Sequence, residues 1–335
     1  MEKNLKLKKI SFTGYTSLRC PVKYYFTYLY PKTSITDRTI IGTIVHEIYE
    51  NLTKRILKLK NPDCSKLIKK ELDDQNLLNI TNEAIQSYEK RNVTIEPFDI
   101  NDILKEIPQH ISLKFMEYLK SKKEEGSEIL IENIKLTDTF KFMNETIQMY
   151  SRPDITILSK DSISIFDIKT GRDFNEDYKL QLMIYLYVYN KELPTSTKKD
   201  ILKGTIFFTR YNKLYPIVWT NNKDVLKTIS NAIKRIDKLY KKLEIKNIKE
   251  IKTFTENLPK KKKNELSEIS DAIFEGSHKT VICKYCPVKN FCPIYDKKQN
   301  KRFKYETEQN KNDEELVFLN TKTEKADEII VNITV

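Results

Sequence analysis

The middle of the chain changes its hydrophobic period, and this change constrains the fold more than any other feature. Three consecutive segments, 128–139, 145–158 and 162–169, alternate polar and apolar residues and are rich in β-branched side chains. This pattern is typical of strands joined by short polar turns. Further elements are expected to follow, a helix at 176–190, strands at 204–210 and 214–220, and a basic amphipathic helix at 223–243. We therefore predict an α/β core in which helices flank a mixed sheet.

The flanking regions are mainly helical in pattern. Residues 38–59 carry an apolar stripe with helical spacing, made by Ile41, Val45, Ile48 and Leu52. Residues 61–125 are polar and helical with breaks near prolines, which indicates an inserted helical subdomain. The expected segments are 1–60 with the first helix, 61–127 as the insertion, 128–245 as the core, 246–296 as a helical, cysteine-bearing segment, and 297–335 as a charged, mobile tail.

Composition excludes several classes of protein. We find no run of about 18 apolar residues and no signal-peptide pattern at the N-terminus, so we expect a cytoplasmic protein without a membrane span. The six glycines do not have the spacing of a P-loop or a Rossmann fingerprint, which argues against a nucleotide-driven motor. A net charge of +13 suits a nucleic-acid partner, although the lysine-rich composition of an AT-rich genome would produce the same excess.

The stretch IFDIKTGR, residues 165–172, places an acid and a lysine on one strand. Residues two apart on a strand share a face, so Asp167 and Lys169 form either a salt bridge or part of a site. Asp154 lies thirteen residues before Asp167, across a turn near Lys160 and Asp161. In an antiparallel hairpin the two aspartates would come roughly opposite each other, where both could face one divalent cation.

The chemistry of this set suits phosphodiester hydrolysis. Mg²⁺ prefers oxygen ligands and usually takes one or two carboxylates, together with water and substrate phosphate. Lys169 could orient the attacking water, stabilise developing charge or help to remove a proton from the water. An Asp-x-Lys triplet alone is weak evidence, because many lysine-rich strands contain one.

These residues occur among others that together resemble a known family. Four motifs, GTIVH at 42–46, RPD at 152–154, DIKTGR at 167–172 and QLMIY at 181–185, resemble in content and order those of the RecB-like branch of the PD-(D/E)xK nucleases. The resemblance implies a restriction-endonuclease-like core, Mg²⁺ or Mn²⁺ as cofactor and Lys169 as the catalytic lysine. It implies a metal held by His46, Asp154, Asp167 and the backbone carbonyl of Ile168, and a DNA path shaped by Gln181, Tyr185 and Arg172.

The residues also allow structural explanations for some of these positions. A histidine such as His46 is otherwise most often a hydrogen-bonded core residue, although the small Gly42 one turn earlier leaves space for an inward imidazole. Gln181 and Tyr185 share one helix face, and their alternative role is to cap the core. The serine at 151 departs from the glycine usual before this motif in the family.

Four of the five cysteines form a second pattern. Cys283, Cys286 and Cys292 are clustered and Cys20 lies far upstream, which supplies four thiolates for one zinc ion or one cluster. A zinc ribbon usually has two Cys-x-x-Cys pairs, and this chain has one. The one-plus-three arrangement resembles the AddB nuclease domain and the CRISPR-associated exonucleases, which implies a [4Fe–4S] cluster. Cys64 is expected to be an ordinary thiol.

The leading hypothesis is a metal-dependent DNA exonuclease that prefers single-stranded or frayed ends. By the resemblance, its role would be CRISPR spacer acquisition or end processing in repair or replication, with a CRISPR integrase or a helicase as partner. The competing hypotheses are a non-catalytic DNA-binding subunit and a zinc-dependent scaffold. Oligomeric state and cleavage polarity do not follow from the sequence.

Overall fold

The computed structural model of the 335-residue chain describes residues 8–29, 34–90, 94–171, 176–192, 201–218, 222–274, 283, 286, 289 and 292–295. The described residues form two compact units, one made of 8–16 and 34–234 and the other of 17–29 and 235–295. The division into five segments expected from the sequence stays a prediction. The expected tail at 297–335 lies outside the described residues.

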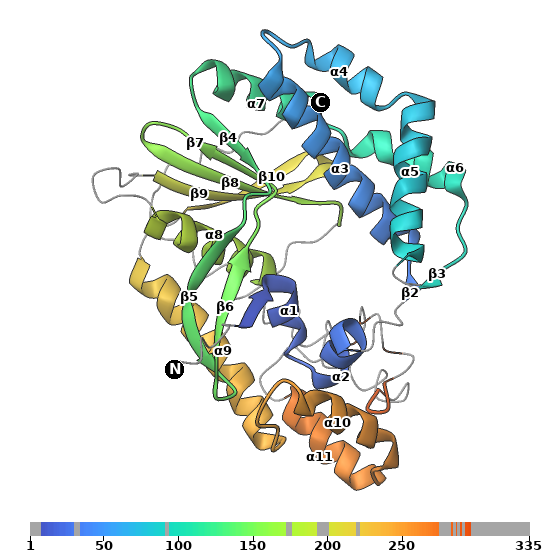
Figure 1. The fold of residues 1–335 in the computed structure, drawn as a ribbon, viewed down its shortest axis with the longest axis vertical. Helices are drawn as coiled ribbons and strands as arrows, with labels where there is room; N and C mark the ends of the chain where they lie inside the picture. Colours follow the sequence, from blue (N-terminus) through green and yellow to red (C-terminus); the bar gives the residue numbers. More distant parts are fainter. Residues whose placement is uncertain are drawn as a thin grey trace, which may run out of the picture. The chain divides into compact units, whose positions relative to one another are not determined.

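The first unit contains a five-stranded mixed sheet, which confirms the predicted core (Figure 1). Its strand order is β10-β9-β8-β7-β4, with β7 and β8 antiparallel and β8 and β9 parallel. The strands span Glu128–Ile131 (β4), Ile155–Leu158 (β7), Ser162–Lys169 (β8), Ile201–Phe208 (β9) and Lys213–Val218 (β10). Strand β8, which carries the Asp-x-Lys triplet, is therefore the centre of the sheet.

A second sheet uses the other half of the same alternating region. Its order is β1-β6-β5, from strands Lys8–Ser11 (β1), Lys135–Phe142 (β5) and Glu145–Ser151 (β6). A parallel pair of two-residue strands, Ser34–Ile35 (β2) and Thr94–Ile95 (β3), is separate from both sheets. The sequence pattern did not predict β1, β2 or β3.

Two of the three predicted central strands are each split between the two sheets. The segment 128–139 is interrupted at Glu132, whose φ of 46° is left-handed, so β4 and β5 separate there. The segment 145–158 is interrupted at Arg152 and Pro153, because proline cannot donate to a strand ladder. The residues on both sides of each break alternate and the breaks are short, which explains why the pattern alone merged the strands.

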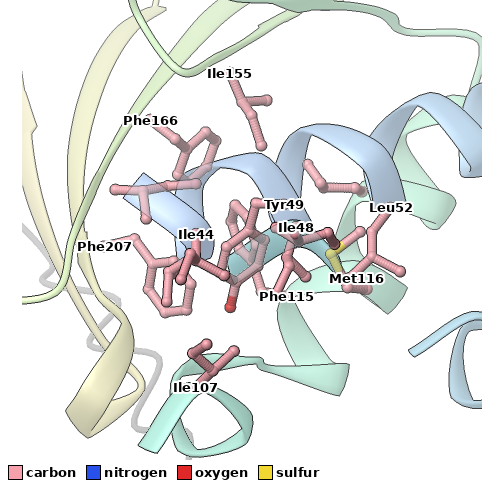
Figure 2. Close-up of a cluster of buried hydrophobic side chains, with 14 of the residues drawn as sticks. Ile44, Ile48, Tyr49, Leu52, Ile107, Phe115, Met116, Ile155, Phe166 and Phe207 are labelled. Atoms are coloured by element: carbon pink, nitrogen blue, oxygen red, sulfur yellow. The ribbon is translucent and has the colours of Figure 1, made fainter. Parts of the chain in front are cut away.

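One face of the five-stranded sheet is covered by α3, Asp37–Lys58. The predicted stripe on this helix is buried, and it meets Phe166 and Phe207 from the sheet (Figure 2). The helices of the 61–125 region pack into the same core, through residues such as Ile107, Phe115 and Met116. They span Cys64–Glu71 (α4), Asp74–Glu89 (α5), Ile100–Glu106 (α6), Ile107–His110 (η2) and Leu113–Glu124 (α7).

The opposite face of the sheet is covered by α8, Glu176–Glu192. This helix contacts β8 and β9 of the larger sheet and also β5 and β6 of the smaller sheet. A helix enclosed in this way is apolar on most of its circumference. Among the α8 residues whose burial the structure describes, eight are buried, at positions 180, 182 and 184–189.

The second unit is helical where it is described. It includes Pro21–Tyr24 (α2), Tyr25–Leu29 (η1), Glu250–Asn257 (α10), Leu258–Lys260 (η5) and Lys263–Phe274 (α11), and α10 packs on α2 and η1. Two helices pass from one unit to the other, Phe12–Ser17 (α1) and Asn222–Lys242 (α9). Among all described helices, none has the length and apolar character that crossing a membrane requires.

Candidate active site

The β7–β8 hairpin brings the two predicted aspartates together. Its antiparallel register pairs Ile155 with Phe166, so one step further along the ladder Asp154 faces Asp167. Ile155 and Phe166 both belong to the core beneath α3, and this burial sets the register, because a slip of one residue would expose them. The hairpin predicted from the sequence is thus present, and the two carboxylates lie at its open end.

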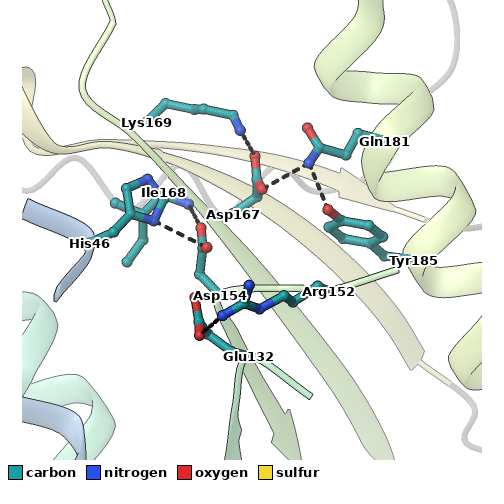
Figure 3. Close-up of polar contacts among 9 residues, drawn as sticks. All are labelled: His46, Glu132, Arg152, Asp154, Asp167, Ile168, Lys169, Gln181 and Tyr185. Carbon is teal, nitrogen blue, oxygen red and sulfur yellow. Dashed lines mark hydrogen bonds and ion pairs between the residues drawn. The ribbon is translucent and has the colours of Figure 1, made fainter. Parts of the chain in front are cut away.

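Asp154 is held by two groups (Figure 3). Its Oδ1 lies 3.1 Å from Nδ1 of His46, which comes from α3. Its Oδ2 accepts a hydrogen bond of 2.6 Å from the backbone N–H of Ile168. In an extended strand the N–H and C=O of one residue point toward the same neighbouring strand, so the carbonyl of Ile168 is directed to the Asp154 side.

Asp167 is held by a different pair of residues. Its Oδ2 lies 2.6 Å from Nζ of Lys169, and its Oδ1 accepts a hydrogen bond of 3.2 Å from Nε2 of Gln181. The same Gln181 nitrogen donates to the hydroxyl of Tyr185 at 2.7 Å. Figure 3 shows both α8 side chains directed toward the aspartate. Gln181 thus contacts Asp167 directly and links it to Tyr185, whose ring is buried in the core.

The pKa values of the two aspartates and of Lys169 are shifted by burial and by the charges of their neighbours. Burial raises the pKa of Asp167, and the nearby Asp154 carboxylate adds to this rise while Lys169 opposes it. Burial also disfavours the charged form of Asp154, yet His46 holds the pKa of Asp154 below its usual value. Burial would lower the pKa of Lys169, but the Asp167 carboxylate raises it above its ordinary value. Two buried carboxylates are thus balanced by one ammonium and one imidazole.

The residues present fit a hard divalent cation, although they are not arranged around one. Nowhere in the described part of the chain do three His, Cys, Asp or Glu side chains form a group that could hold a metal ion as placed. However, Asp167 Oδ2 is buried, and it lies 2.6 Å from Nζ of Lys169. Two carboxylates, an imidazole and a carbonyl provide the oxygen-rich donors that Mg²⁺ and Mn²⁺ prefer.

The remaining predicted positions near the hairpin have different outcomes. Arg172 lies outside the described residues. Arg152, in the RPD motif, forms an ion pair with Glu132. At Gly42, an added Cβ would lie 3.4 Å from Oγ1 of Thr170, which shows that α3 passes close to the end of the Asp-x-Lys strand.

Sequence reasoning missed the residues that surround the lysine. The backbone carbonyl of Lys169 accepts a hydrogen bond of 3.3 Å from Oγ1 of Thr209, and that hydroxyl lies 2.7 Å from Nδ1 of the buried His110. The ring of Tyr178 lies 5.0 Å from Nζ of Lys169. Thr209 and His110 carry no motif, and only the proximity of Tyr178 to Gln181 in the sequence could have drawn attention to it.

The four predicted cluster cysteines belong to the second unit. Burial raises the pKa of Cys20 to about 12, and the thiols of Cys292, Cys286 and Cys283 add to this rise. All four cysteines are among the described residues, and the structure does not place them as a metal site. Cys64 is buried in the core of the first unit.

Comparisons with known proteins agree with this geometry at the level of family. A search of curated proteins finds no match. One solved structure, described as "Crystal structure of SSO0001", is 14% identical with a TM-score of 0.27, over 84% of this chain and 96% of that one, a likeness too slight to carry an argument. Residues 10–293 match the family described as the PD-(D/E)XK nuclease superfamily, and they include every candidate residue of the hairpin, α3 and α8. The chain therefore belongs to the PD-(D/E)XK nuclease superfamily, whose fold it has.

Proposed function

We propose that the protein is a metal-dependent deoxyribonuclease that hydrolyses phosphodiester bonds in single-stranded or frayed DNA ends. The observation that carries this proposal is the pairing of Asp154 with Asp167 at the open end of one hairpin, beside Lys169. Membership of a nuclease superfamily supports the same activity. The preference for an exonuclease reaction comes from the resemblance of the motifs to the RecB-like branch.

In this proposal Asp154, Asp167, His46 and the carbonyl of Ile168 hold Mg²⁺ or Mn²⁺. The bound metal would polarise the scissile phosphate and lower the pKa of an attacking water. Lys169 stabilises the negative charge that develops on the phosphate, from a position fixed by Asp167. Gln181 and Tyr185 orient Asp167 and border the DNA path.

The test is digestion of end-labelled single-stranded DNA with Mg²⁺ or Mn²⁺ by wild type, Asp167→Asn and Lys169→Met. Removing a residue that acts at the reacting phosphate is expected to lower kcat by about 10²-fold or more. Asp161→Asn and Lys160→Met are matched controls, because they change the same residue types at the exposed turn of the same hairpin. Equal digestion by all five proteins would refute the site, and substrates blocked at the 5′ or 3′ end would establish polarity.

We also propose that Cys20, Cys283, Cys286 and Cys292 bind a [4Fe–4S] cluster. Their one-plus-three spacing along the sequence and its resemblance to iron–sulfur nucleases support this proposal. A cluster would link segments far apart in the sequence, so its main effect would be on stability. Iron, sulfide and zinc are to be measured in wild type, Cys286→Ser and the control Cys64→Ser. Stoichiometric zinc without iron or sulfide would replace this assignment with a zinc site.

Finally, we propose that the nuclease acts in the cytoplasm in CRISPR spacer acquisition, with repair or replication end processing as the alternative. The support is the resemblance to CRISPR-associated exonucleases. Because the given sequence has no motor motif, long-range work on DNA would require a separate integrase or helicase. Gene neighbours that encode an integrase favour the first role, and neighbours that encode a helicase favour the second.

A further inference from the structure

A row of basic and aromatic side chains leads away from the catalytic lysine across the sheet. Lys169 on β8 is in register with Phe208 on β9, and Phe208 is in register with Lys213 on β10. Register partners point to the same face of a sheet. Neighbouring strands are about 4.8 Å apart, so the backbone of Lys213 lies about 10 Å from the backbone of Lys169. Lys213 is on β10, an edge strand of the sheet.

Two tyrosines pack along this row. The ring of Tyr178, from α8, lies 5.0 Å from Nζ of Lys169 and 6.2 Å from the ring of Phe208. On the other side of Phe208, the ring of Tyr215 makes an edge contact at 5.3 Å. Phe208 is buried at 1% exposure, whereas Tyr215 is 40% exposed. Phe208 therefore packs against one side of Tyr215, and part of the Tyr215 ring is accessible.

The packing confirms which face carries the row. Phe208 and Ile217 belong to the core beneath α8, whereas Leu214 packs into the core beneath α3. Because side chains alternate along a strand, Lys213, Tyr215 and Ile217 share the α8 face. This is also the face of Asp167 and Lys169, so the row is continuous with the candidate active site.

This combination fits one kind of occupant. An accessible tyrosine ring on a rigid support can stack with a nucleobase, and an exposed lysine two residues away can contact the adjacent phosphate. A base inside a duplex cannot offer its face to such a ring. The positive row and the exposed aromatic therefore favour a single strand over a protein segment or a paired helix.

We propose that Tyr215 and Lys213 form a binding subsite for single-stranded DNA, which guides an unpaired strand along β10 toward Lys169. Tyr215 stacks on a base, Lys213 contacts the backbone, and Tyr178 closes the row next to the catalytic lysine. The subsite rests on the proposed nuclease function, because it supplies the preference for unpaired strands that this function requires.

The experiment measures binding in EDTA, where no metal-dependent cleavage takes place. A fluorescent oligothymidylate and an abasic strand of equal length are titrated with wild type, Tyr215→Leu and Tyr215→Phe, with thermal melting as a check of folding. Loss of one base stack is expected to weaken oligothymidylate binding by Tyr215→Leu about tenfold. Tyr215→Phe keeps the ring and should bind like wild type. Among the three proteins, only Tyr215→Leu should bind the oligothymidylate and the abasic strand with equal affinity.

Lysine variants test the backbone contact. Lys213→Ala is expected to weaken the binding of both strands, whereas Lys203→Ala is a matched control, since Lys203 is exposed on β9 but on the opposite face. The proposal is overturned if Tyr215→Leu binds as tightly as wild type or loses equal affinity for both strands, or if the two lysine variants behave alike. Failure of the nuclease function would appear separately, as intact binding with no difference in digestion between wild type and Asp167→Asn.

Discussion

At the scale of single residues, the candidate site consists of two buried carboxylates, each paired with a basic side chain. Asp154 is paired with His46 and Asp167 with Lys169, at 3.1 and 2.6 Å. Buried carboxylates of like charge are costly unless cations compensate them. Without metal, the imidazole and the ammonium provide that compensation. A divalent cation would take over part of this role and should therefore stabilise the fold.

The first prediction is that Mn²⁺ or Mg²⁺ raises the thermal unfolding midpoint of the wild type. At about 100 times Kd, binding to the folded state alone adds about 2.7 kcal/mol, which corresponds to several degrees. Asp154→Asn should lose most of this shift, while Asp161→Asn at the exposed turn should keep it. Melting curves with metal and with EDTA measure the effect, and an equal shift in the two variants would count against the assigned ligands.

The second prediction concerns His110, whose imidazole faces Thr209, Glu106 and Arg210. Burial lowers the pKa of His110 below its ordinary value of about 6.5. As the pH falls below about 6.5, the unfolded chain takes up a proton before the folded chain does, so this histidine makes the protein less stable in acid. His110→Asn, which keeps a donor near Thr209, should therefore lose less stability than wild type.

Urea unfolding of both proteins at pH 7.5 and 5.5 measures this difference. The expected result is a smaller drop of the midpoint in His110→Asn, whatever the other carboxylates contribute, because those are common to both proteins. An equal drop in the two proteins would mean that His110 has the same pKa in the folded and unfolded states.

At the scale of elements, the site depends on the close approach of α8 and α3 to the strands. Gly204 on β9 faces α8, where an added Cβ would lie 3.1 Å from Cβ of Leu182 and 3.1 Å from Cδ1 of Leu186. The Leu182 atom is next to the backbone and cannot rotate away. At Gly42 on α3 the nearest atom, Oγ1 of Thr170, is at 3.4 Å, an ordinary contact.

The third prediction is that Gly204→Ala destabilises the protein by about 1–3 kcal/mol, through overpacking between β9 and α8. Gly42→Ala is the matched control, and its stability should stay within about 1 kcal/mol of wild type, because alanine also favours the helix. Denaturant unfolding compares the two. If Gly204→Ala were as stable as wild type, α8 would not be packed tightly enough to fix Gln181.

At the scale of the whole molecule, the net charge of +13 is the broadest signal for a polyanionic partner. Charge of this kind acts through release of counterions from the nucleic acid, so its signature is salt dependence. A lysine that touches a phosphate contributes to that dependence, whereas a lysine elsewhere on the surface contributes little.

The fourth prediction is that single-strand affinity falls steeply as salt increases. In a plot of log K against log salt, Lys213→Ala should make the slope less negative by about 0.7, the value for one lost phosphate contact on a single strand. Lys203→Ala should leave the slope unchanged. Identical slopes for wild type and both variants would mean that neither lysine contacts the strand.

Much of the site could be predicted because its residues follow regular spacings within single strands, one hairpin and one helix. Strand alternation placed Asp167 and Lys169 on one face, the spacing to Asp154 predicted the hairpin, and helical spacing put Gln181 and Tyr185 together. Each of these inferences needs only neighbours a few residues apart, for which backbone geometry is regular.

The division of the strands between two sheets could not be predicted in this way. Strands β4, β7 and β8 belong to one sheet and β5 and β6 to another, although all five show the same alternation. Sheet membership depends on partners distant in sequence, such as β9 for β8 and β1 for β6. The alternation of a strand indicates that one of its faces is buried. It does not indicate which strand lies beside it or which element covers that face.

The sequence by itself determined the residue types of the site, the hairpin that joins its two aspartates and the family to which the chain belongs. Only the tertiary structure decided that His46 pairs with Asp154, that His110 and Thr209 form a hydrogen-bonded chain to the Asp-x-Lys strand, and that Lys213 and Tyr215 continue the face of Lys169. The reason is physical. Local spacing fixes direction along one element, whereas distances between side chains on different elements are set by how buried surfaces pack together.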